Sequence, residues 1–154
     1  DLRSSALVST LEFLPTVVNA CGGRMPVRRI DGVDAMPVLR GDPGASVRDA
    51  LAIYYEVNDL QAVTDGRFKL VLPHRHRSYL DVPPGRDNQP GPYASARQGL
   101  ALYDTASDPG ETVDVQAGHP AELARLERAA QTIRADLGDG GVPGPGCRPA
   151  APAR

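Results

Sequence analysis

The sequence predicts an α+β fold: a small antiparallel sheet of about four strands with one long C-terminal amphipathic helix packed on it, preceded by further helices. Three observations predict it. Apolar residues recur at helical spacing near both ends of the chain, β-forming residues gather at 51–72 and 100–103, and turn signals separate them. The 154 residues are enough for one modest domain.

The N-terminal segment from Ser4 to Gly23 is predicted to be helical. Its apolar residues recur every three or four positions and define one helical face: Leu7, Leu11, Leu14 and Val18. Pro15 must break or restart this helix because its ring removes a backbone donor, and the first position of a second helix suits it best. Gly22-Gly23 supplies a left-handed stop, and a turn with a short apolar stretch follows at 30–41.

Strands are predicted where the period changes after Ala50. They cover residues 51–55, 60–64, 67–72 and 100–103, with Asp65-Gly66 as a two-residue hairpin turn. Residues 79–98 are rich in proline and are predicted to form a long loop.

The last predicted helix opens with Pro120 at its first position and ends at Gly138. Its apolar face is a regular series: Leu123, Leu126, Ala130, Ile133 and Leu137. The tail 140–154 is Pro/Gly/Ala-rich, and we expect it to be disordered.

Composition gives no support to two classes of partner, and we expect neither. The net charge of −2 argues neither for nucleic acid nor for a membrane surface. No apolar run approaches the roughly 18 residues that a membrane span needs. Cys21 and Cys147 form no metal-ligand spacing. The chain starts at Asp1 without a signal-peptide pattern, so its compartment stays open between periplasmic, secreted and cytoplasmic, and we expect it to be a fragment.

Four strings, in the same order, resemble the type I sulfatases of the arylsulfatase kind. Residues 9–16 with 20–22 are similar to "Ser-x-x-Asp-Leu-x-Pro-Thr … Ala-Gly", with Glu12 where Asp is usual, and 30–39 to "Asp-Gly-Val-Asp-x-x-Pro-x-Leu". Residues 62–70 resemble "Ala-Val-Arg-x-Gly-x-Trp-Lys-Leu", although Thr64 and Phe68 depart from it. The fourth string runs from Leu100 to Val115, with Leu-Tyr-Asp and then Asp-Pro-Gly-Glu-Thr.

This resemblance implies a domain organisation. Residues 1–41 would be the end of an alkaline-phosphatase-like α/β catalytic domain and its connector, 42–139 the C-terminal sulfatase subdomain, and 140–154 the tail. The partner implied is the missing N-terminal catalytic domain, whose absence would leave an interface exposed for self-association.

The resemblance also implies the chemistry. The family oxidises a cysteine within Cys-x-Pro-Ser-Arg to formylglycine, beside a Ca²⁺ ion, and hydrolyses sulfate esters. Neither Cys21 nor Cys147 stands in that string. We therefore expect this chain alone to be inactive, without catalytic residues and without bound Ca²⁺. The alternative is a truncated, non-catalytic binding or assembly module of the same family.

The stretch 69–78 is the one most suited to touch a sulfate-ester substrate. If the strand continues past Pro73, alternation would put His74 and His76 on one face and Arg75 and Arg77 on the other. Some sulfatases carry a similar "Phe-Pro-His-x-Tyr-Arg-Ser" run here, and an arginine fork suits a sulfate. The predicted substrate-binding residues are His74, His76 and Arg77. The competing interpretation is a solvated, arginine-rich loop edge.

Other interpretations are weaker. Two histidines are too few for a zinc site, and few aromatic residues accompany the basic cluster, which disfavours nucleic acid. The acidic residues of the 104–111 turn could hold a cation, but we expect them to cap turns. His119 is expected at a helix start. Three tyrosines are expected half-buried in the sheet with bonded hydroxyls: Tyr54, Tyr55 and Tyr103.

Overall fold

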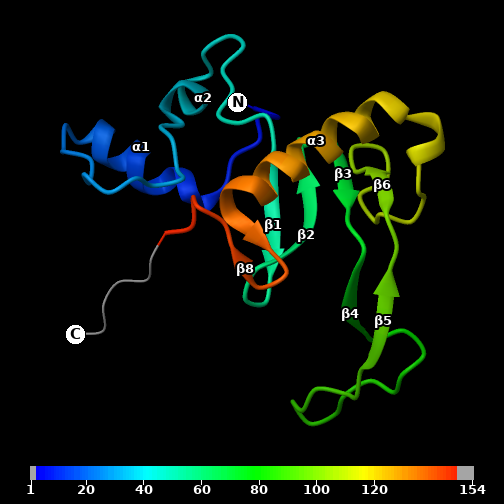
Figure 1. Ribbon diagram of the computed structural model, residues 1–154. Helices are drawn as coiled ribbons and strands as arrows, with labels where there is room; N and C mark the ends of the chain where they lie inside the picture. Colours follow the sequence, from blue (N-terminus) through cyan, green and yellow to red (C-terminus); the bar gives the residue numbers. More distant parts are fainter. Residues whose placement is uncertain (1–2, 149–154) are drawn as a thin grey trace. The chain divides into compact units, whose positions relative to one another are not determined.

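The computed structural model describes residues 3–148, which fall into two compact units (Figure 1). The first unit holds the chain up to Leu51 together with Asp65–Arg67, and the second holds Ala52–Thr64 and the chain from Phe68 onward. The domain limits expected at residues 41 and 139 stay predictions.

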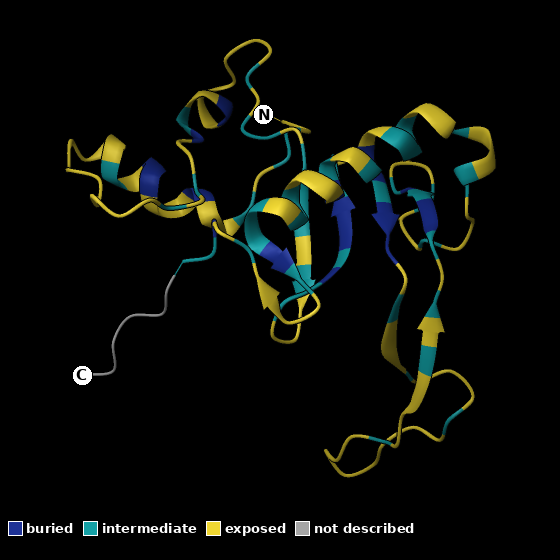
Figure 2. Ribbon diagram, in the orientation of Figure 1, coloured by how far each residue is buried: buried dark blue, intermediate teal, exposed yellow. Residues whose placement is uncertain are grey.

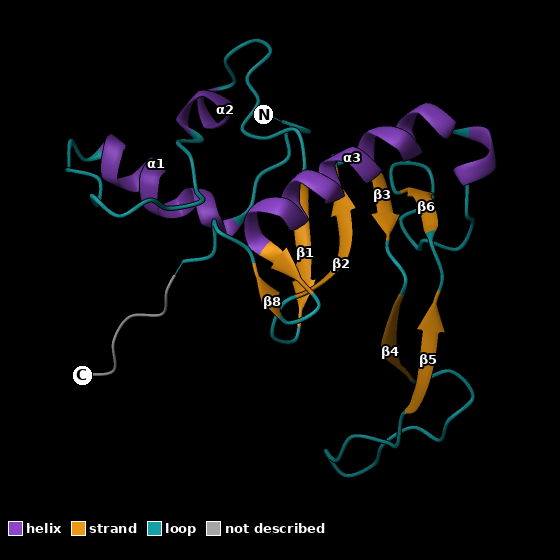
Figure 3. Cartoon of the chain, in the orientation of Figure 1, coloured by secondary structure: helices purple, strands orange, loops and turns teal. Residues whose placement is uncertain are grey.

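The first unit contains three short helical elements (Figure 3), which are η1 (Thr10–Glu12), α1 (Phe13–Ala20) and α2 (Met36–Arg40). The helix predicted from Ser4 begins later, because Ser9 caps it. The Ser9 hydroxyl accepts from the Leu11 amide at 3.2 Å, and the Glu12 carboxylate accepts from the Ser9 amide at 2.7 Å. Pro15 lies inside the first turn of α1 rather than at its first position, where its missing donor is equally harmless.

Polar contacts and one glycine hold the first unit together. The Thr16 hydroxyl accepts from the Ala35 amide at 2.9 Å, and Arg48 pairs with the buried Glu12. Burial opposes the ionisation of Glu12, but bonds from Ser9 and Arg48 outweigh it and lower its pKa. A Cβ on Gly32 would lie 1.9 Å from the backbone oxygen of Leu11, so only glycine fits there.

A four-stranded sheet forms the centre of the second unit, as predicted. Its order is β1-β2-β3-β6, with antiparallel pairing of β2 with β3 and of β3 with β6. The strands are β1 (Leu51–Tyr55), β2 (Asp59–Thr64), β3 (Phe68–Val71) and β6 (Ala101–Asp104). The turn between β2 and β3 has three residues rather than the two expected, because the Asp65 carboxylate binds the Arg67 amide at 2.8 Å around Gly66, whose φ is +96°.

The helix α3 (Pro120–Leu137) packs against β2 and β3, which confirms the predicted helix on the sheet. Pro120 opens it after His119, and Gly138 ends it with φ +88°. Buried residues concentrate along β2, β3 and β6 (Figure 2). The largest fully buried side chains of the described residues are Leu60, Val63, Leu70, Leu102 and Leu126. Register puts Val63, Leu70 and Leu102 on one face of the sheet.

A second hairpin, whose second strand lies in the predicted loop, extends from the sheet (Figure 1). Strand β4 (His74–Ser78) pairs antiparallel with β5 (Ala94–Gln98). The 79–98 loop prediction is therefore wrong for 94–98. The strand signal was weak because the apolar residues of β5 are two alanines, which have low β-propensity, and most of its residues are exposed.

The chain after α3 folds back instead of becoming disordered. Two-residue strands β7 (Gly138–Asp139) and β8 (Val142–Pro143) form a hairpin, and the amide of Gly146 donates to the oxygen of Asp136 at 2.7 Å. The prediction of a disordered tail is wrong for 140–148, because glycines that suggest disorder here permit close backbone approach. Residues 149–154 lie outside the described residues.

The three tyrosines have different environments. The Tyr54 hydroxyl donates to the Gly138 oxygen at 2.8 Å, and burial raises the pKa of Tyr54, as expected for a half-buried sheet residue. Tyr55 is 57% exposed, so the prediction that it is half-buried is wrong. Tyr103 is half-buried on the face of the sheet opposite Leu102. Among the described residues, no helix is long and apolar enough to pass through a membrane.

Candidate functional site

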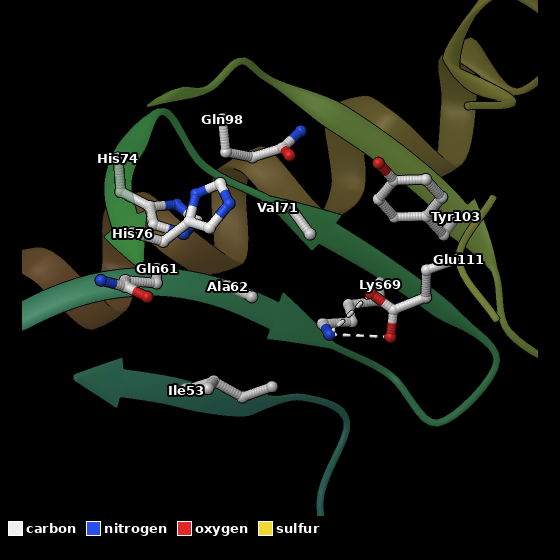
Figure 4. A pocket seen from close by; sticks show the side chains of 10 residues that line it. All are labelled: Ile53, Gln61, Ala62, Lys69, Val71, His74, His76, Gln98, Tyr103 and Glu111. Carbon is white, nitrogen blue, oxygen red and sulfur yellow. Dashed lines mark hydrogen bonds and ion pairs between the residues drawn. The ribbon is translucent and has the colours of Figure 1, made fainter. Parts of the chain in front are cut away.

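The face of the sheet opposite α3 carries a hollow of about 350 Å³ (Figure 4). Antiparallel register places Lys69 beside Tyr103 and Ala62 beside Val71, all on this face. The remaining lining residues come from β1, β2, β4, β5 and the turn after β6: Ile53, Gln61, His74, His76, Gln98 and Glu111.

An ion pair occupies one end of the hollow. The Lys69 ammonium donates to both carboxylate oxygens of Glu111 at 2.8 Å (Figure 4). The turn before Glu111 is fixed by Asp108, whose carboxylate accepts from the Val113 amide at 2.9 Å and the Thr112 amide at 2.7 Å. These backbone bonds lower the pKa of Asp108 and keep it as an anionic acceptor. The turn thus presents Glu111 to the sheet.

The two predicted histidines occupy the other end of the hollow. Alternation along β4 puts His74 and His76 on the same side, with ring centroids 5.7 Å apart. His74 Nδ1 lies 2.7 Å from the oxygen of Leu72, which fixes the orientation of that ring and leaves its other nitrogen free of this contact. Figure 4 shows both rings near Gln98, whose amide can donate or accept.

Arg77 lies on a different surface from the histidines. Its guanidinium carbon is 4.7 Å from the centre of the Tyr93 ring, in a second hollow of about 140 Å³. His76 borders both hollows. The structure therefore brings His74 and His76 together and leaves Arg77 on the neighbouring face. Whether the three bind a substrate stays a prediction.

Three residues of the first hollow were not among the predicted site residues. Lys69 was predicted only as the first residue of the 69–78 stretch and Tyr103 only as a half-buried sheet residue, although the period-two alternation of β3 and β6 could have placed them on the polar face. Glu111 was expected to cap a turn and instead pairs with Lys69. Asp104 and Asp108 do bond turn amides, as expected.

The described residues do not fit a calcium site. Within residues 3–148 no three His, Cys, Asp or Glu side chains lie together in a way that could hold a metal ion. Cys21 is exposed, while the Cys147 thiol lies 2.8 Å from the backbone oxygen of Leu137. His119 packs against Phe68 with ring centroids 5.0 Å apart, at the start of α3. The two hollows offer the ring nitrogens of His74 and His76 and the guanidinium of Arg77, which suit an anionic ligand.

Comparison with known proteins gives a consistent class. No family model matches the chain. It is 29% identical to human "Arylsulfatase A" over 85% of its length and 31% identical to mouse "Steryl-sulfatase" over 84%, covering 27% and 23% of those proteins. It is 30% identical to bovine "Arylsulfatase A" over 71% of its length and covers 22% of that protein.

The fold has a solved counterpart. The structure of BT4656 in complex with its substrate D-glucosamine-2-N,6-O-disulfate matches 80% of the chain with a TM-score of 0.51 and 21% identity, and the match covers 23% of that protein. The curated relatives belong to the sulfatases, the hydrolases of sulfuric esters. This chain is a sulfatase-like polypeptide, as the four strings predict, and it spans about a quarter of the length of the curated relatives it matches.

Proposed function

We propose that this chain is the C-terminal part of a sulfatase that hydrolyses sulfate esters, where it completes the fold and forms one wall of the substrate pocket. The observation that carries the proposal is the hollow on the sheet, where His74 and His76 lie together on a chain similar to sulfatases. The nucleophile and the Ca²⁺ ion would belong to the N-terminal catalytic domain, the partner that the family resemblance implies.

The wall is suited to hold a sulfuryl group rather than to cleave it. His76 can donate one hydrogen bond in either neutral tautomer. His74 donates its Nδ1–H to the Leu72 oxygen, so its other nitrogen donates to a sulfate only when the ring is cationic. The Arg77 fork can donate two parallel bonds to sulfate oxygens. The charge of the Lys69 ammonium is compensated by Glu111, so Lys69 offers little net positive charge to a ligand. None of these groups is an activated nucleophile, which is the basis for proposing that the chain alone is inactive.

The test joins this chain to the reading frame upstream of Asp1, if that frame encodes Cys-x-Pro-Ser-Arg, and measures turnover of an aryl sulfate. We expect turnover by the joined protein and none by the chain alone. Replacing His74 and His76 together by Ala, which offers no side-chain hydrogen bond, should raise KM about tenfold with a smaller change in kcat, since each hydrogen bond lost costs about 0.5–1.5 kcal/mol.

The matched control is Arg128→Gln, which changes an exposed side chain of α3 that does not line the hollow. It should leave KM unchanged. Turnover by the chain alone would contradict its non-catalytic role, and an unchanged KM in the double histidine variant would remove these residues from the pocket.

A second function is favoured by one observation: the first unit exposes an apolar helix face. Phe13, Leu14 and Val17 of α1 are 69%, 50% and 54% exposed, and an apolar groove of about 250 Å³ runs between α1 and α2. Such a face supports a non-catalytic assembly module that associates with itself or with a catalytic domain. Light scattering after size exclusion tests it: self-association that falls on Phe13→Ser supports the module, and a monomer at high concentration contradicts it.

A further inference from the structure

The β4–β5 hairpin has two chemically different faces. Residues directly opposite in an antiparallel pair point to the same side. His74 faces Gln98 and His76 faces Ala96, and these residues form the side of the hairpin that borders the hollow on the sheet. On the other side Arg75 faces Arg97 and Arg77 faces Ser95. We name these four the arginine face: Arg75, Arg77, Ser95 and Arg97.

The arginine face carries uncompensated positive charge. Like charges directly opposite each other in a strand pair are unfavourable, yet Arg75 and Arg97 occupy such a position and all three arginines are exposed. Within residues 3–148 none of the three forms an ion pair with a carboxylate. Glu56 lines the adjoining hollow of about 140 Å³ without pairing with either of its arginines.

Neutral groups orient two of these guanidinium groups. The Arg75 guanidinium donates to the Ser95 hydroxyl at 3.2 Å, and Arg77 lies over the ring of Tyr93. Both contacts restrict the side chain without neutralising its charge, so the remaining N–H donors are free for an anion. An arginine held in place this way loses less entropy when it binds.

We propose that the arginine face binds a second anionic group, sulfate or carboxylate, of a sulfated polysaccharide. The inference rests on the proposed function, because it assigns a polyanionic substrate to the same wall. Two surfaces that share His76 would contact one extended ligand: the histidine side the reacting sulfate ester, the arginine side a neighbouring anion. A nucleic acid fits less well, because the Tyr93 ring that bases would stack on is already engaged by Arg77 and Tyr79.

The experiment measures binding by the chain itself, so no turnover is needed. Fluorescence anisotropy follows a labelled heparin oligosaccharide titrated with the wild-type chain, with Arg75→Gln/Arg97→Gln, and with Arg128→Gln on α3. The double variant should bind about tenfold more weakly at low salt, since each exposed ion pair changes affinity by roughly two- to fivefold. Arg128→Gln should stay within about twofold, because it removes a charge outside the arginine face.

A variant that should gain affinity serves as a control for misfolding, because a misfolded chain would not bind more tightly. Glu56→Gln removes the carboxylate that lines the adjoining hollow, so binding should tighten by about two- to fivefold. A desulfated oligosaccharide that keeps its carboxylates identifies the anion. Lost binding assigns sulfate, and retained binding that still depends on Arg75 and Arg97 assigns carboxylate.

Three results would overturn the inference. They are equal losses in the α3 control and the double variant, unchanged binding in the double variant, or tighter binding of a single-stranded DNA with the same number of charges. Each can occur while the joined protein still turns over an aryl sulfate, so failure here is distinguishable from failure of the proposed function.

Discussion

Asp139 connects the end of α3 to the start of β2, and its removal should be the most informative perturbation of the second unit. One carboxylate oxygen accepts from the Leu60 amide and the Gly140 amide, both at 2.8 Å. The other accepts from Arg134 Nε at 2.6 Å. Asp139→Ala removes all three bonds and leaves the amide of the buried Leu60 without its acceptor.

The expected cost follows from these contacts. A hydrogen bond to a charged group contributes about 1.5–3 kcal/mol. The bond from Leu60 belongs to this kind because its acceptor is a carboxylate, and Leu60 is only 2% exposed. The Arg134 pair adds only about 0.2–1 kcal/mol, because its side chains are 39% and 25% exposed. We expect Asp139→Ala to lower the free energy of unfolding by about 3 kcal/mol.

Urea unfolding followed by far-ultraviolet circular dichroism measures this loss. The control is Asp59→Ala, at a half-buried aspartate whose carboxylate accepts from the Gln61 side chain at 2.8 Å. It should cost less than about 1 kcal/mol. Equal losses in the two variants would refute the idea that Asp139 secures the hairpin after α3.

The same contact predicts a pH dependence. Burial raises the pKa of Asp139, but bonds from Leu60, Arg134 and Gly140 outweigh it, so the folded pKa lies below the ordinary 3.8. A lowered folded pKa means that the stabilisation is complete above the unfolded value and is lost as pH falls through the folded value. The stability difference between wild type and Asp139→Asn should therefore shrink as the pH falls below about 4, and a constant difference would contradict the assignment.

Three further variants test other contacts by the same unfolding measurement. Gly32→Ala should cost about 1–3 kcal/mol, because its Cβ would meet a backbone oxygen of η1 at 1.9 Å, and a neutral result would show that η1 shifts freely. Glu111→Gln should cost less than about 1 kcal/mol and make stability less salt-dependent, since the Lys69 pair is half-exposed; an unchanged salt dependence would argue against the pair. Tyr54→Phe should cost about 1 kcal/mol by losing its hydroxyl bond, whereas Tyr55→Phe, at an exposed ring, should cost nothing measurable.

Regular spacing of apolar residues in the sequence predicted the framework of the second unit. The apolar series of α3 and the β-forming runs of the four-stranded sheet carry strong period signals, because each element buries one face against another. Pro120 and Gly138 fixed the two ends of α3 for backbone reasons that do not depend on the rest of the chain.

Elements held by polar contacts were harder to predict. Strand β5 has little burial to produce alternation, and the hairpin β7–β8 depends on contacts with residues about eighty positions away in the sequence, such as those of Asn58 with Leu137 and Val142. The helix start at Ser9 depended on Glu12 three positions later, a capping signal that apolar spacing from Ser4 concealed.

The candidate site divides in the same way. His74 and His76 could be placed together from strand alternation alone, because the period is two wherever a strand runs. Their neighbours Lys69 and Tyr103 required the register of β3 against β6, and Arg97 required a strand that the sequence did not reveal. Register depends on tertiary packing, so local patterns could not supply it.

Hydrogen bonds of Tyr54, Asn58 and Asp139 join the first strands to the chain after α3. These bonds affect folding during synthesis. They join residues separated by 79 to 84 positions, so they cannot form while the chain is still being synthesised up to α3. Until residues 138–142 have been synthesised, the first strands lack these bonds, and contacts of such long range form slowly. A reporter or tag fused after residue 148 should be tolerated, whereas one inserted between 138 and 146 should leave a newly translated chain prone to aggregation.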